Sequence, residues 1–160
     1  MKILLAYPRW DYPTFGQLQE PLGIMCVAAT LKAAGHEPLV VDLAVDPIED
    51  LDAALVDAGM VGVSSSTALY GRACRVLDRI RQRRPGLPVV IGGPHATVLP
   101  EQTLARGFDA VALGEGEHTA VDMVAAKMPA SMTPTSTPGS SSSAMVGRAS
   151  SASKSPLSAR

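Results

Sequence analysis

The chain has 160 residues, which is the length of one ordinary domain and short for two. Apolar residues make up 46%, charged residues 18% and aromatic residues 4%, a composition typical of a globular protein with an Ala/Val/Leu core and not of a disordered or fibrous chain. The net charge of −1 predicts no general attraction to nucleic acid or to a membrane surface.

We expect no signal peptide at the N-terminus of this sequence. It holds one lysine, a short apolar run and then Pro-Arg-Trp, without the long apolar region and cleavage site of a signal peptide. No run of about 18 apolar residues occurs, so we expect no membrane span and a cytoplasmic protein. In a reducing cytoplasm, Cys26 and Cys74 are expected to be buried free thiols.

Short apolar runs recur along the first part of the chain and predict five β-strands. The runs are rich in β-branched residues or continuously apolar, as expected for strands covered on both faces. They are Ile3–Tyr7, Glu37–Leu43, Met60–Ser64, Leu87–Ile91 and Asp109–Leu113.

Helical patterns separate these runs. Asp46, Pro47 and Glu49 are typical of a helix start, with Asp46 as the N-cap and Pro47 at the first helical position. The other predicted helices are Pro21–Ala34, Thr67–Arg84, Pro100–Arg106 and Glu115–Lys127. Strand–helix alternation predicts an α/β fold, a flavodoxin-like three-layer sandwich whose five-stranded parallel sheet has the order 2-1-3-4-5.

The composition changes abruptly near Lys127. Residues 128–160 contain eleven serines, three threonines and four prolines, with no acidic or aromatic residue. Such a segment cannot bury enough apolar surface to offset the entropy of ordering, so we expect a domain at 1–127 and a disordered tail at 128–160. The abrupt change favours a chain cut short and extended by unrelated coding.

In a parallel α/β sheet, ligands bind at the carboxyl ends of the strands, so the loops that follow the strands carry the candidate site. The loop after the first strand holds Trp10 and Tyr12, aromatic residues that suit a flat apolar ligand or equally cap the core. The third strand is followed by four hydroxyl side chains, of which helix capping would need one: Ser64, Ser65, Ser66 and Thr67.

Two glycine-rich loops complete this edge. Gly92 and Gly93, followed by Pro94 and His95, allow the close approach of a ligand or serve only as a turn. The last strand is followed by Gly114, Glu115 and Gly116.

Three common nucleotide or phosphate sites are excluded by specific residues. No Gly-Lys-Ser/Thr occurs, which excludes a P-loop. A dinucleotide fingerprint starting at Gly114 would have Thr119 in place of its third glycine. A receiver domain would need Asp and Lys where Ser64 and Gly114 stand. No catalytic set is evident. The serines, His95 and Glu117 could be combined into a nucleophile–histidine–acid triad, but the rim of any α/β fold offers such a combination.

The loops taken together resemble the N-terminal cobalamin-binding domain of B12-dependent radical SAM enzymes. The resemblance covers residues 1–127 and implies a Rossmann-like fold that binds cobalamin (B12) non-covalently. It rests on Ile3–Pro8, Pro21-Leu22-Gly23, Ala34-Gly35-His36-Glu37, Val61-Gly62-Val63-Ser64, Gly92–Thr97 and Gly114-Glu115-Gly116-Glu117, in that order.

The resemblance implies that the corrin ring lies across the strand ends and that the nucleotide tail enters near the serine and double-glycine loops. In the broader group, the serine of an S-x-[LT] element and a later Gly-Gly line the tail's channel. The resemblance places Ser64 and Ser66 at the serine element, and Gly92 follows at a similar spacing.

Two motifs of related proteins are absent. The cobalt-ligating D-x-H-x-x-G motif does not follow the first strand, and His95 and His118 are not favoured as substitutes. The C-x-x-x-C-x-x-C motif of the radical SAM domain does not occur, so Cys26 and Cys74 cannot hold an iron–sulfur cluster. We therefore expect a cofactor-binding module without catalytic residues or metal ligands, whose partner is a radical SAM domain or a separate catalytic chain. The alternatives are a stand-alone corrinoid carrier or sensor, and a small-molecule-binding α/β protein without cobalamin.

Overall fold

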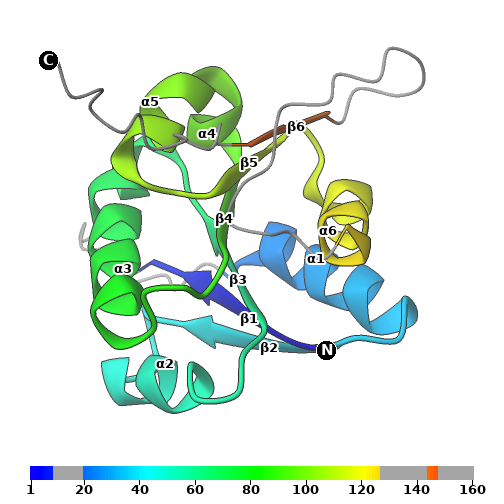
Figure 1. Ribbon diagram of the computed structural model, residues 1–160, viewed down its shortest axis with the longest axis vertical. Helices are drawn as coiled ribbons and strands as arrows, with labels where there is room; N and C mark the ends of the chain where they lie inside the picture. The colour runs from blue at the N-terminus through cyan, green and yellow to red at the C-terminus, as the bar shows by residue number, and fades with distance from the viewer. Residues whose placement is uncertain (9–19, 127–143, 148–160) are drawn as a thin grey trace, which may run out of the picture.

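The computed structural model describes residues 1–8, 20–126 and 144–147, the last of these as backbone alone. Strands and helices alternate from the N-terminus, as the apolar pattern predicts (Figure 1). The strands are β1 (Lys2–Tyr7), β2 (Glu37–Asp42), β3 (Met60–Ser64), β4 (Val89–Gly92), β5 (Ala110–Leu113) and β6 (Ala144–Gly147). The α-helices are α1 (Leu22–Ala33), α2 (Ile48–Ala54), α3 (Tyr70–Arg83), α4 (Pro94–Val98), α5 (Pro100–Arg106) and α6 (Gly116–Ala125).

The first five strands form a parallel sheet in the order β2-β1-β3-β4-β5, which confirms both the predicted fold class and the predicted strand order. The register aligns Leu5 of β1 with Gly62 of β3 and then with Val90 of β4. Because the strands run in one direction, their carboxyl ends and the loops that follow them meet at one edge.

The sixth strand was not expected. β6 pairs antiparallel with β5, with Ala144 opposite Leu113 and Gly147 opposite Ala110. The open edge of β5 presents unpaired N–H and C=O groups, and a short extended segment satisfies them. The expected disorder of 128–160 therefore does not hold for these four residues. The others in the tail lie outside the described residues, and the boundary at Lys127 stays a prediction.

Helices cover both faces of the sheet. In Figure 1, α1 and α6 lie on one side and α2 and α3 on the other. Successive side chains of a strand point to opposite faces of the sheet, so alternate residues pack into two apolar layers, one on each face. Leu4 and Val61 pack with α2 and α3, whereas Ile3, Leu5 and Met60 pack with α1 and α6. The result is the predicted three-layer sandwich.

Several helix ends differ from the predictions by one to three residues, and α3, predicted from Thr67, begins at Tyr70 after a 3-10 turn at Thr67–Leu69. α2 begins at Ile48 with Pro47 as the N-cap residue, because the Asp46 carboxylate instead accepts a hydrogen bond from the Asp42 backbone N–H (2.8 Å). The loop expected after the fourth strand contains a short helix, α4, with Pro94 in its first turn. Pro favours that position because its missing N–H would have no partner there.

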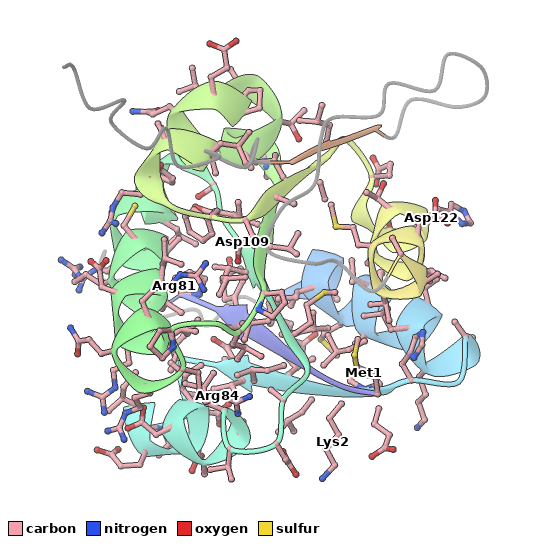
Figure 2. The ribbon with its side chains drawn as sticks, in the orientation of Figure 1. Met1, Lys2, Arg81, Arg84, Asp109 and Asp122 are labelled. Carbon is pink, nitrogen blue, oxygen red and sulfur yellow. The ribbon has the colours of Figure 1, made fainter. Side chains whose placement is uncertain are left out.

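The part-buried ion pair between Arg81 and Asp109 holds the amino ends of β4 and β5 together (Figure 2). The Asp109 carboxylate accepts hydrogen bonds from the Arg81 guanidinium and the Val89 backbone N–H, both at 2.7 Å. Arg81 also donates to the carbonyls of Leu87 and Gly107. These bonds fix the start of both strands and hence the positions of the loops at their far ends.

The two thiols differ from their expectation: Cys26 is exposed and Cys74 is partly exposed. Both are free. Within the described ranges, no helix has both the length and the apolar character needed to cross a membrane.

Candidate functional site

A cavity of about 470 Å³ lies between the sheet and the pair of helices α1 and α6. It opens at the carboxyl ends of β3, β4 and β5, beside the residues that follow these strands. α1 contributes the stripe Ile24, Val27 and Leu31, spaced so that the three side chains share one helix face. The cavity is therefore a slot with one wall of sheet and one wall of helix.

The slot exists because small residues line the sheet beneath it. Gly62, Ser64, Gly92 and Ala112 all border the cavity. Gly62 and Ser64 follow Met60 at intervals of two along β3, so they face the same side as Met60, toward α1 and α6. Larger side chains at these positions would fill the space that the helices leave open.

Gly92 and Gly93 have different roles. A Cβ on Gly92 would meet only Ala112 at an ordinary contact distance of 3.5 Å, on the cavity side of β4. Gly93 has a φ of +95°, and a Cβ there would lie 2.8 Å from the carbonyl oxygen of Ser65. Gly92 thus keeps the cavity open, whereas Gly93 lets the β4–α4 loop pack against the β3 loop.

The four hydroxyls after β3 do not act together. Ser64 lines the cavity. Ser65 is buried, and its hydroxyl donates to the Ser66 carbonyl at 2.8 Å. The Ser66 Oγ is buried without a hydrogen-bond partner in the described part of the chain. Thr67 lies 3.3 Å from the His95 ring through its Oγ1. Of these four hydroxyl residues, the structure brings only Ser64 to the cavity.

His95 lies outside the cavity lining, although Pro94 beside it borders the mouth. Its ring is 3% exposed and stacks on Tyr70 with centroids 3.8 Å apart. Burial lowers the pKa of His95, and Gln102 opposes this shift without reaching hydrogen-bonding geometry with Nε2. The imidazole thus packs against the first residue of α3 and does not line the cavity.

Thr97 is a site residue that the sequence did not single out. Its Oγ1 donates to the Gly93 carbonyl and accepts from the Gly114 backbone N–H, both at 3.1 Å. One hydroxyl therefore joins the loop after β4 to the loop after β5 at the cavity mouth. A threonine in a helical stretch carries no local signal for such a bridge, because its second partner is 17 residues away.

The segment after β5 forms the remaining rim. Gly114, Glu115, Gly116 and Glu117 border the cavity, with Glu117 in the first turn of α6. A Cβ on Gly116 would lie 3.2 Å from Val27, so this glycine lets α6 approach α1. The predicted residues Trp10 and Tyr12 lie outside the described residues.

A second groove, of about 620 Å³, runs between β2 and α2. It carries the charges of Glu37, Asp46, Asp50 and the Lys2–Asp57 ion pair. It lacks the loops that follow β3, β4 and β5. The candidate site is therefore the smaller cavity, which suits a ligand with an apolar part and a polar end.

Known proteins are similar to this chain over most of its length. The family model of the B12 binding domain matches residues 13–124. The chain is 29% identical over 139 residues to the anaerobic magnesium-protoporphyrin IX monomethyl ester cyclase of Synechocystis sp.. It is 30% identical over 133 residues to an uncharacterized methyltransferase of Pyrococcus horikoshii. The alignments cover 79% and 78% of this chain but only 28% and 29% of the two relatives.

Solved structures share the fold. The cobalamin-dependent S-adenosylmethionine radical enzyme OxsB, with aqua-cobalamin and S-adenosylmethionine bound, matches with a TM-score of 0.65 at 18% identity, over 79% of this chain and 19% of that one. The N-terminal domain of a hypothetical protein of Thermotoga maritima matches with a TM-score of 0.51 at 21% identity, over 74% of this chain and 95% of that one. The family match spans the strands and helices that enclose the cavity from α1 to α6, and the chain belongs to the B12-binding domain family.

Proposed function

We propose that this chain binds a corrinoid cofactor, with the nucleotide tail in the cavity and the corrin ring across the carboxyl ends of the strands. The observation that carries the proposal is the slot floored by Gly62, Ser64, Gly92 and Ala112 in a member of the B12-binding domain family. It opens at the edge of the sheet where ligands of parallel α/β folds bind.

The residues present fit such a ligand. The tail of cobalamin has an apolar bicyclic base and a polar ribose phosphate. The cavity has an apolar interior and a polar rim, to which Ser64, Thr97, Glu115 and Glu117 contribute side chains. Gly92 supplies the close approach, because a Cβ at this position would project toward Ala112 and narrow the entrance.

The chain's own contribution is binding and orientation. A bound corrinoid supplies a cobalt centre able to carry an alkyl group. Ser64 and the glycine loops would hold the polar part of the tail, and the apolar walls from α1 and α6 would exclude water from its base. Thr97 would keep the two ligand loops at a fixed separation.

We propose further that the chain corresponds to the N-terminal cofactor-binding part of a B12-dependent radical SAM enzyme of the methyltransferase or cyclase type. The support is the partial coverage of the two relatives, whose names describe a cyclase and a methyltransferase. A C-x-x-x-C-x-x-C segment in a neighbouring reading frame would support this assignment. Its absence there would favour a stand-alone corrinoid carrier or sensor.

The binding proposal has a direct test. The purified chain is mixed with hydroxocobalamin, desalted and examined for the visible corrin band. We expect the wild type to retain the band and Gly92→Val to lose most of it, at least tenfold in occupancy. The matched control is Gly71→Val, since a Cβ at Gly71 meets nothing within 4 Å. A wild-type protein that retains no corrinoid would contradict the proposal and favour a small-molecule-binding protein of another kind.

A further inference from the structure

The cavity changes character with depth. Its polar side chains, those of Ser64, Thr97, Glu115 and Glu117, come from the ends of strands, from α4 and from the start of α6, all at the mouth. The deeper wall is made by Leu31, Met60, Val90, Met123 and Val124. All five are at least 94% buried and carry no hydrogen-bonding N or O atom in their side chains.

The backbone offers no partner in the interior either. β3 is paired with β1 on one side and with β4 on the other, and β4 is paired with β5. The N–H and C=O groups of these central strands are therefore used within the sheet. On the opposite wall, the central turns of α1 and α6 use theirs within the helix.

The apolar part is long enough to hold a bicyclic ring. Met60 and Ser64 stand four residues apart on β3, which corresponds to about 13 Å along a strand. Under the proposed function, on which this inference rests, the base of the nucleotide tail lies below the hydroxyl rim. The groups on that base then meet only hydrocarbon and thioether.

We propose that the cavity selects corrinoids by the base of their tail, preferring an apolar benzimidazole to a purine. Dimethylbenzimidazole presents two methyl groups and a single ring nitrogen besides the one that joins it to the ribose. Adenine presents an exocyclic amine and three such ring nitrogens. Each of these polar groups loses its water on entering a wall without donors or acceptors, so the purine binds more weakly.

The test compares three corrinoids on the full chain by equilibrium dialysis with absorbance detection. They are cobalamin, the corresponding cobamide with adenine, and cobinamide, which lacks the nucleotide. Excess cyanide occupies both axial positions of the cobalt, so that the tail is free in the first two. We expect cobalamin to bind at least tenfold more tightly than the adenine cobamide.

Each outcome separates this inference from the proposed function. Equal dissociation constants for cobalamin and the adenine cobamide overturn the inference and leave corrinoid binding intact. Cobinamide binding as tightly as cobalamin also overturns it, because the tail would then contribute no affinity. Failure of all three to bind overturns the proposed function itself.

A substitution inside the cavity tests the same point. Met123→Gln keeps the length of the side chain and places an amide in the interior, where Met123 is 1% exposed. We expect the dissociation constant of the adenine cobamide, divided by that of cobalamin, to fall from at least about tenfold to below about threefold. Met25→Gln, on the exposed side of α1, is the matched control and leaves the ratio unchanged. Should thermal unfolding show that Met123→Gln does not fold, Met60→Gln takes its place, and the comparison of ligands on the unsubstituted chain decides the matter alone.

Discussion

A Cβ on Gly93 would lie 2.8 Å from the carbonyl oxygen of Ser65, closer than real Cβ contacts occur. The same Ser65 donates its N–H to the Gly92 carbonyl and accepts from the His95 N–H. The loops after β3 and β4 are thus interlocked through Ser65, beneath the cavity mouth. This contact gives Gly93 a structural role, although Gly93 borders the cavity as Gly92 does.

Substitution of the two glycines therefore has different consequences for stability. Gly93→Ala combines a steric clash with a backbone conformation that alanine rarely adopts, which costs about 1–3 kcal/mol or more. Gly92→Ala adds a methyl group in ordinary contact with Ala112 and is expected to change stability little. Urea unfolding of both variants measures the difference. Equal loss of stability in the two would show that the Ser65 contact does not constrain the loop.

Thr97 is expected to preorganise the mouth of the cavity. Thr97→Val keeps the size of the side chain and removes both hydrogen bonds to Gly93 and Gly114. We expect several-fold weaker retention of hydroxocobalamin and faster hydrogen exchange at the Gly114 N–H. Thr97→Ser restores the hydroxyl and should recover both properties. A valine variant with unchanged affinity and exchange would remove Thr97 from the account of the site.

The ion pair between Arg81 and Asp109 is expected to contribute to the stability of the fold rather than to ligand binding. Asp109→Asn weakens charge-assisted bonds to Arg81 and to the Val89 N–H, which are part-buried, and should lower the free energy of unfolding by about 1–3 kcal/mol. Asp57→Asn, which removes the exposed partner of Lys2, is the control and should leave unfolding by urea unchanged. An equal loss in the free energy of unfolding in both variants would show that partial burial does not strengthen the Arg81–Asp109 ion pair.

The stability of the domain should fall when pH drops through the titration of His95. Burial lowers the pKa of this imidazole below its ordinary value of 6.5, so the unfolded chain takes up a proton first as pH falls. The stability that the neutral ring provides is complete above pH 6.5 and declines below it. His95→Phe keeps a ring against Tyr70 but has no group that titrates. Its free energy of unfolding should therefore fall less than that of the wild type when the pH drops from about 7.5 to about 5.5. Identical pH profiles of urea unfolding would contradict this assignment.

The fold was predictable from the sequence because strand and helix signals alternate without ambiguity. Continuous apolar runs such as Met60–Ser64 mark strands that are covered on both faces. Right-handed crossovers restrict the topology without fixing the strand order, and 2-1-3-4-5 is one of the orders that they allow. β6 was not predictable, because a short segment with weak β propensity pairs only where the edge of β5 is available.

The candidate site was predictable only in part. The glycine loops and Ser64 follow strand ends, and the position of the ligand edge depends on topology alone. The depth of the cavity was not apparent, because it depends on the spacing between the sheet and the pair α1 and α6. The run of hydroxyls after Ser64 was misleading, since the side chains of Ser65 and Thr67 turn away from the cavity toward Ser66 and His95.

The central claim is that the tail of a corrinoid occupies the slot between the sheet and the helices α1 and α6. Methionine methyl groups report on it directly, because Met60 and Met123 line the slot whereas Met25 is exposed on α1. In protein labelled with carbon-13 at the methionine methyl groups, hydroxocobalamin should shift the NMR signals of Met60 and Met123 and leave that of Met25 in place. Unchanged Met60 and Met123 signals in protein that retains the corrin band would contradict the account.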